Sequence, residues 1–158
     1  MPAPYLTKAT LILACIITGL TTIKAQEKES AVTKMIKDRV YTFTVQSYTS
    51  TTVSQRQLTE DYSLRIKSDS VIGLLPYYGQ SYSAQINLTD GGLKFSSAKF
   101  DYDFVEKKKG KCEITIRPKD DRTVQLLFLT VFSDGGAQLQ VTSSNREPMT
   151  FNGYVSVK

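Results

Sequence analysis

From Tyr41 to the end of the chain, apolar and polar residues alternate, and this period of two is the feature that most limits the possible folds. Alternation puts apolar side chains on one face of an extended strand and polar ones on the other. The first such segment, residues 41–46, has the sequence YTFTVQ. Clusters of Gly, Ser and Asp separate the segments at short intervals, as they do between antiparallel strands. The chain is therefore predicted to be mainly β, as a single antiparallel β-sandwich or small β-barrel of about eight strands.

Two segments depart from simple alternation. Residues 124–132 are apolar at positions of both faces, which predicts the most buried strand of the sheet. Residues 47–57 are rich in Ser and Thr and offer little to bury, so they are predicted to form a loop or a mobile edge. The other predicted strands are Tyr62–Lys67, Val71–Leu75, Leu93–Phe95, Phe100–Phe104, Cys112–Ile116, Ala137–Thr142 and Met149–Val157.

One stretch before the strands has a helical period. Ala31, Val32, Met35, Ile36 and Val40 recur at spacings of three and four, with charged residues between them. Residues 26–39 are therefore predicted to form a short amphipathic helix that covers one face or one end of the sheet. Residues 40–158 would hold all the antiparallel strands, so that 26–158 is one β-rich domain.

The first 25 residues are predicted to be a signal peptide. Lys8 precedes an apolar run over residues 9–20, and Ala25 stands before a polar segment that begins at Gln26. The expected product is exported, either periplasmic or secreted to the cell surface, with no membrane span after cleavage. Two alternatives stay open, a retained N-terminal anchor and lipid anchoring at Cys15.

Charge gives no indication of a nucleic-acid partner. Removal of residues 1–25 takes away Lys8 and Lys24 and leaves 18 basic and 15 acidic residues, a net charge of +3. This charge is mild, and no stripe of Lys and Arg with interleaved aromatic residues is present.

The residue inventory excludes several chemistries. The chain has no histidine, which removes histidine-dependent nucleophiles and the usual proton shuttle near neutral pH. Beyond residue 25 only Cys112 remains, so no disulfide, thiolate zinc site or redox pair can form within the domain. We therefore expect no cofactor, no metal and no catalytic residue, and a protein that is not an enzyme.

One pair of carboxylates leaves a catalytic alternative open. Asp101 and Asp103 lie two residues apart on a predicted strand and point the same way, about 7 Å apart. Two carboxylates at such a separation could serve a glycosidase. The structural alternative is a solvated outer face, because Phe100, Tyr102 and Phe104 occupy the other side of the strand.

Aromatic side chains mark a candidate binding site. Tyr77, Tyr78 and Tyr82 lie around the bend that Pro76 and Gly79 introduce. A tyrosine offers an apolar ring and a polar tip, which suits ligand stacking at the mouth of a barrel. The structural alternative is that this bend closes one end of the core.

Five segments resemble one family. They are Leu74–Ala84, Asp90–Phe95, Glu113–Asp120, Val141–Arg146 and Phe151–Gly153, in that order along the chain. They resemble the family of small exported bacterial proteins called domain of unknown function 4251. The resemblance covers essentially the whole chain after the signal peptide. It implies a single-domain, envelope-associated protein of Gram-negative bacteria, and it implies no activity, ligand or catalytic residue.

These observations lead to a ranked set of functions. The first is a non-enzymatic envelope domain that binds a small molecule, a glycan or an envelope protein near Tyr77, Tyr78 and Tyr82. The alternative is a structural or inhibitory envelope protein without a small ligand. A hydrolase that depends on Asp101 or Asp103 ranks last.

Overall fold

The structure is a computed structural model of the whole chain. It describes residues 31–51, 54–59, 61–77, 92–144 and 146–157. Within them, one helical segment (residues 31–37) precedes the strands. The strands are β1 (Tyr41–Ser50), β2 (Arg56–Gln57), β3 (Ser63–Ile66), β4 (Val71–Pro76), β5 (Gly92–Ser97), β6 (Phe100–Glu106), β7 (Cys112–Pro118), β8 (Val124–Val131), β9 (Gly136–Ser143) and β10 (Met149–Ser156), with a short 3₁₀ turn, η1 (Lys108–Gly110), between β6 and β7.

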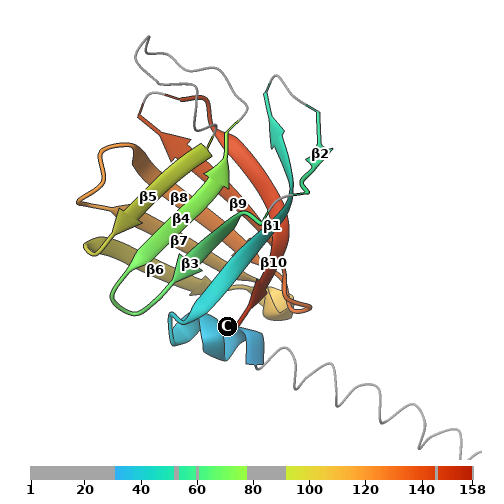
Figure 1. Cartoon of the computed structure of the whole chain (residues 1–158). Helices are drawn as coiled ribbons and strands as arrows, with labels where there is room; N and C mark the ends of the chain where they lie inside the picture. The colour runs from blue at the N-terminus through green and yellow to red at the C-terminus, as the bar shows by residue number, and fades with distance from the viewer. Residues whose placement is uncertain (1–30, 52–53, 60, 78–91, 145, 158) are drawn as a thin grey trace, which may run out of the picture.

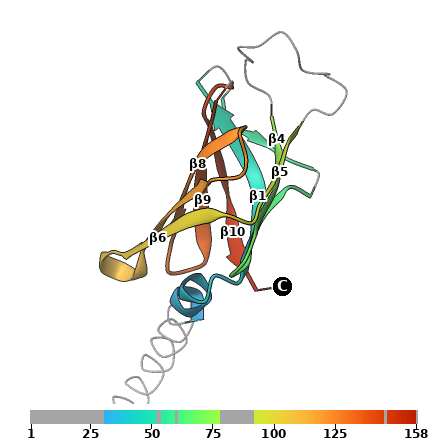
Figure 2. The ribbon, with the colours of Figure 1, turned by 90° about the vertical axis from the view of Figure 1, so that its left-hand side faces the viewer.

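All the strand pairs are antiparallel, and together they form one strongly curved sheet (Figure 1). The strand order is β5-β4-β3-β1-β10-β9-β8-β7-β6, with β2 paired to the outer part of β1. The two edge strands, β5 and β6, are consecutive in the chain, so the sheet curls into a nearly closed barrel. Figure 2 faces the boundary between them and shows β5 and β6 running apart from the turn that joins them.

The predicted fold class is confirmed, and the barrel is the form that the sheet takes. Every segment predicted as a strand contains one, and β2 is an additional short strand. The turn that joins β8 to β9 contains Gly135 at φ +89°, where a side chain would be strained. The Asp134 carboxylate accepts a hydrogen bond of 2.9 Å from the Gly136 N–H, which fixes this turn.

The prediction of a loop or mobile edge for residues 47–57 is wrong for residues 47–50, whereas residues 51, 54 and 55 lie outside the strands. Residues 47–50 continue β1 and pair with β10, and Arg56–Gln57 form β2. A β-bulge at Gln46 moves the inward face from odd to even positions, so that Tyr48 enters the core with only 4% of its surface exposed. The Gln46 carbonyl instead accepts a hydrogen bond of 2.9 Å from the Leu58 N–H. Backbone pairing and one buried ring outweigh the polar composition of this segment.

The prediction that residues 124–132 form the most buried strand is not confirmed, because β8 buries five of its eight residues whereas β4 buries four of six. Val124, Leu127, Leu129 and Val131 are buried, and Thr130 is buried on the opposite face. The strand ends at Val131, because Phe132 already belongs to the turn and is 46% exposed.

The helical segment covers one end of the barrel (Figure 1). Its inward face is formed by Val32 and Ile36, both buried, with Met35 packed beside them. The helix ends in a left-handed residue, Arg39 at φ +54°, and the Val40 N–H donates to the Met35 carbonyl at 3.2 Å. This is the hydrogen bond that closes a helix C-terminus in the Schellman motif. The predicted helix is thus confirmed over its described part.

Inward-facing side chains fill the barrel. Fully buried aromatic and aliphatic residues from all the long strands meet in one cluster, which includes Phe43, Leu64 and Phe151. Gly73 lies directly opposite Phe95, and the Phe95 ring occupies the space where a side chain at Gly73 would stand. The core therefore uses a glycine and an aromatic ring as one packing unit across β4 and β5.

Candidate functional site

The carboxylates of β6 face outward and are engaged in ion pairs. The Asp103 carboxylate lies 2.6 Å from the Arg117 guanidinium. The Asp101 carboxylate lies at the same distance, 2.6 Å, from the Lys119 ammonium group. These side chains are about half exposed or more, whereas Phe100, Tyr102 and Phe104 pack against the core from the other face of β6. The arrangement is the solvated outer face that was the structural alternative. Within the described residues, no three Cys, Asp or Glu side chains lie close enough together to hold a metal ion.

Of the three candidate tyrosines, the structure describes one. Tyr78 and Tyr82 lie outside the described residues, so the ligand-binding prediction for the three stays a prediction. Tyr77 follows β4 and is partly buried against the core. Its hydroxyl accepts a hydrogen bond of 2.9 Å from the Glu147 N–H, and the Arg146 guanidinium stands 4.6 Å from the centre of its ring. These contacts join the end of β4 to the segment before β10. For Tyr77 they agree with the structural alternative, in which the bend closes one end of the core.

Little space lies beneath Tyr77. A void of about 10 Å³ is lined in part by Pro76, Tyr77, Glu147 and Met149, and it has room for at most one water molecule. Glu147 is 6% exposed, and its carboxylate accepts a hydrogen bond of 3.1 Å from the Thr51 N–H. The described part of this end of the barrel is therefore packed and hydrogen-bonded.

A pair of tyrosines fastens the helical segment to the opposite end. The Tyr102 hydroxyl donates to the Ile36 carbonyl at 2.9 Å, and the Tyr41 hydroxyl lies 3.1 Å from the Tyr102 oxygen. Because the Tyr102 proton is used by Ile36, Tyr41 is the donor to Tyr102. Burial raises the pKa of Tyr102 to about 12, and burial also raises the pKa of Tyr41. The Arg39 guanidinium stands 4.7 Å from the centre of the Tyr102 ring.

The boundary between β5 and β6 is held by one carboxylate. Asp120 accepts hydrogen bonds from the Ser97 hydroxyl and from the Ala98 N–H, the latter at 3.0 Å. The Lys119 N–H donates to the Lys99 carbonyl at 2.7 Å beside them. These bonds attach the turn between the two edge strands to the end of β7. The Ser97 hydroxyl, followed by the Ala98 N–H, lowers the pKa of Asp120.

Asp120→Asn is expected to reduce the loss of stability at acid pH. A carboxylate with a lowered pKa in the folded state stabilises the fold above its unfolded pKa, which is about 4, and this contribution disappears as the pH falls through the folded pKa. The check is urea unfolding at a series of pH values from neutral to acid. Asp61→Asn is the control, because the structure describes no partner for that side chain. Identical pH profiles for the two variants would show that Asp120 does not fasten this turn.

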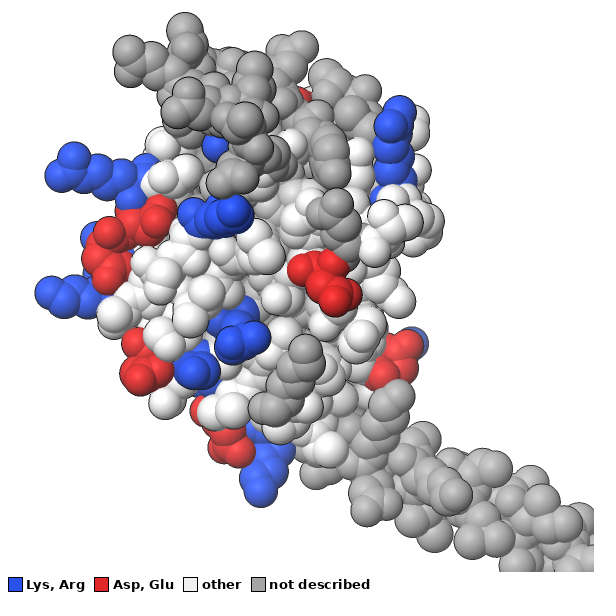
Figure 3. Space-filling model, in the orientation of Figure 1, with Lys and Arg blue, Asp and Glu red and all other residues white. Residues whose placement is uncertain are grey.

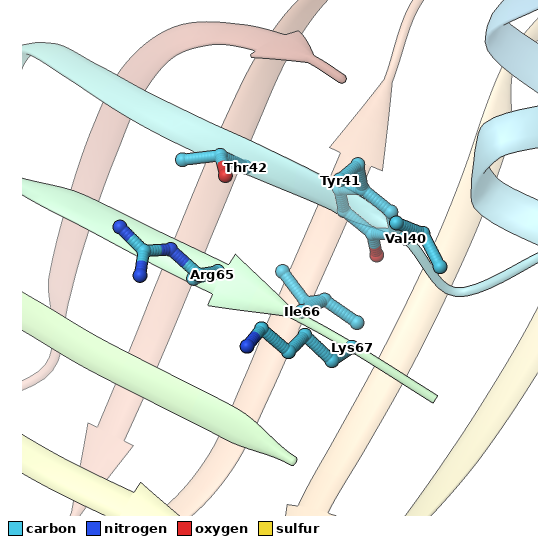
Figure 4. A pocket seen from close by; sticks show the side chains of 6 residues that line it. All are labelled: Val40, Tyr41, Thr42, Arg65, Ile66 and Lys67. Carbon is cyan, nitrogen blue, oxygen red and sulfur yellow. The ribbon is translucent and has the colours of Figure 1, made fainter. Parts of the chain in front are cut away.

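One pocket is a groove on the outer wall of the barrel (Figure 4). It lies where the start of β1 runs beside the end of β3 and encloses about 290 Å³. Thr42 stands opposite Arg65, and Tyr41 stands opposite Ile66. Tyr41 and Ile66 turn their side chains into the core, so the wall of the groove is built by the outward residues. The lining residues are Val40, Tyr41, Thr42, Arg65, Ile66 and Lys67.

Two cations dominate the charge of this groove. Arg65 lies in β3 and Lys67 directly follows the strand, and both side chains line the groove (Figure 4). Within the described part of the chain neither forms an ion pair, although Lys37, Lys107, Lys111, Arg117 and Lys119 all do. Val40, 45% exposed, adds an apolar wall. A small anion with an apolar portion matches this combination.

Sequence reasoning missed this groove. Its one signal is the alternation of Arg65 and Lys67 with Leu64 and Ile66, which puts two cations on one face. That pattern is also typical of an ordinary solvated strand. The groove depends on which strand lies beside β3, and the neighbour is β1, whose Thr42 precedes its partner Arg65 by 23 residues.

The fold and the groove define a class: a nearly closed antiparallel barrel with one helix-covered end and a cationic groove on its outer wall. The profile of the family described as Domain of unknown function (DUF4251) matches residues 23–155, and the chain belongs to this family. The predicted resemblance is thereby confirmed.

A solved structure supports the same fold. The chain is similar to a DUF4251 family protein from Bacteroides eggerthii DSM 20697, with a TM-score of 0.61, 12% identity, and coverage of 81% of this chain and 86% of that one. At this identity the similarity shows the fold alone. A search of curated proteins gave no match. Within the described residues, no helix has the length and apolar character needed to cross a membrane.

Proposed function

We propose that the protein is an exported, non-enzymatic binding domain that holds the anionic group of a small ligand in the groove between β1 and β3. The observation that carries the proposal is the pair Arg65 and Lys67, which face one pocket without a described ion-pair partner. An arginine offers several N–H donors in a planar fork, and a lysine offers a mobile ammonium group. Together they can bind a carboxylate, sulfate or phosphate group from two sides.

The size of the groove supports a small ligand. Its volume of about 290 Å³ is at the lower end of the range for small-molecule sites. The absence of histidine and the ion-paired state of Asp101 and Asp103 support binding rather than catalysis.

The first test is native mass spectrometry of the protein purified from its own cell envelope, with fractionation to check export. We expect a discrete added mass from an acidic small molecule. The double variant Arg65→Gln, Lys67→Gln should lose it, because both charged donors are removed. The matched control Lys99→Gln, Arg122→Gln carries the same change of charge outside the groove and should keep it.

Other outcomes would contradict the proposal in different ways. Loss of the added mass in Tyr78→Ala but not in the groove variant would place the ligand at the site predicted near Tyr77, Tyr78 and Tyr82. A clean mass without ligand in the unaltered protein would support the structural or protein-binding alternative, and cross-linking in cells would then identify the partner.

A further inference from the structure

Two apolar side chains stand exposed beside the groove. Ile72 is 40% exposed and Leu74 is 37% exposed, both on the outward face of β4. Ile72 on β4 pairs directly with Arg65 on β3. Arg65 therefore lies between the groove, which it lines, and Ile72. Directly paired residues on one face have Cβ atoms about 5 Å apart. The cationic groove therefore continues into an apolar strip.

The charged outward residues of the described strands β3, β4 and β5 are all basic. Leu74 pairs with Lys94 on β5, and Ile72 pairs with Ser96 on its other side. On β3, β4 and β5 the charged outward residues are Arg65 and Lys94, with Lys67 just beyond β3, and the outward face of these strands carries no acid. Figure 3 shows this side of the barrel, where positive and negative side chains are scattered among uncharged ones.

We infer that the ligand of the groove is an amphiphile with one anionic head and a short alkyl chain. This inference rests on the proposed function and adds the chemical class of the ligand. The head lies between Arg65 and Lys67, and the chain crosses Ile72 towards Leu74. Ile72 and Leu74 lie about 7 Å apart along β4, so the strip matches a short chain better than a long one. Covering these side chains removes apolar surface from water, which favours binding.

The test uses a series of straight-chain carboxylates, butyrate, hexanoate, octanoate and decanoate, each below the concentration at which it forms micelles. Binding is followed by the amide chemical shifts of residues 40–42, 65–67 and 72–74. A fully buried CH₂ group raises affinity about fourfold, so partial cover by an open strip should give roughly twofold for each added CH₂. Octanoate should then bind on the order of tenfold more tightly than butyrate.

The variant Ile72→Ser, Leu74→Ser separates this inference from the proposed function. It should bind butyrate as the unaltered protein does, while octanoate loses its advantage. The variant Arg65→Gln, Lys67→Gln should weaken the whole series, and Lys99→Gln, Arg122→Gln should leave it unchanged.

Each remaining outcome overturns one of the two statements. Equal affinity for butyrate and octanoate in the unaltered protein would contradict the amphiphile and leave the anion site standing. If neither the carboxylates nor inorganic phosphate and sulfate change the amide chemical shifts of the groove residues, the proposed anion site is wrong. Binding to vesicles of anionic phospholipid without binding to any soluble carboxylate would replace the single amphiphile with a membrane surface.

Discussion

Gly153→Ala is expected to lower the free energy of unfolding by about 3 kcal/mol, the upper part of the usual range for overpacking. Gly153 lies in β10 opposite Val45, just before the bulge in β1. An added Cβ would overlap the carbonyl group of Thr44, and the Phe43 ring stands 3.2 Å away. Neither neighbour can move easily, because one is backbone of a central strand and the other is buried in the core. Chemical denaturation would measure the loss.

The control for this substitution is Gly136→Ala. Gly136 is also a strand residue, but an added Cβ there would meet only the Asp134 carboxylate, at 3.1 Å, which can shift by giving up its hydrogen bond to the Gly136 N–H. We expect a smaller loss, of about 1 kcal/mol, the net contribution of one hydrogen bond. If the two variants were equally stable, the close approach of β10 to Thr44 would be wrong.

Tyr102→Phe is expected to destabilise the protein by about 2 kcal/mol and to loosen the helical segment. The substitution keeps the aromatic ring beneath Arg39 but removes the oxygen that connects Tyr41 to Ile36. Tyr41 is 2% exposed, and its hydroxyl would then lack its acceptor; a buried hydroxyl without a partner is destabilising by about 1–3 kcal/mol. Chemical denaturation gives the stability, and amide hydrogen exchange at residues 32–37 gives the local effect.

Two comparisons test the direction of this hydrogen-bond chain. Tyr41→Phe should be the milder change, because it removes a donor while Tyr102 still donates to Ile36. The double variant should be no less stable than Tyr102→Phe alone. If Tyr41→Phe were the more damaging substitution, the assigned donor and acceptor would be reversed.

The same pair makes stability depend on alkaline pH. The pKa of Tyr102 rises to about 12 on folding, from an unfolded value of about 10. Its contribution is complete below the unfolded pKa and is lost as the pH rises through the folded pKa. Tyr102→Phe should therefore show a shallower fall in stability above about pH 10 than the unaltered protein.

Sequence periodicity predicted the strands well where one face alone is buried. Tyr41, Phe43 and Val45 follow the alternation, and the structure buries all three. The pattern failed at Gln46, because a bulge inserts one residue and exchanges the two faces beyond it. Nothing local marks that exchange. It is fixed by Gly153, whose missing side chain lets Thr44 approach, and Gly153 lies at the other end of the chain.

The site was less predictable for a related reason. The aromatic residues near Pro76 could be proposed as a site because they cluster within a single segment of the sequence. The groove is visible only after β1, β3 and β4 are in register, since Thr42, Arg65 and Ile72 come from three strands. A cation without an acidic neighbour is a property of the folded surface and not of the sequence around it.

The strand order also has a consequence for how the chain folds. Strands β1 to β5 and strands β6 to β10 are two meanders, each built from pairings between segments close in sequence. The pairing of β1 with β10 alone joins the first meander to the second within the ladder. Closing that long loop carries the largest entropy loss, so β1–β10 docking is expected to limit the folding rate. A chain divided at the turn between Ser97 and Phe100 is expected to yield two complementary fragments that recombine through this strand pairing and through the shared core.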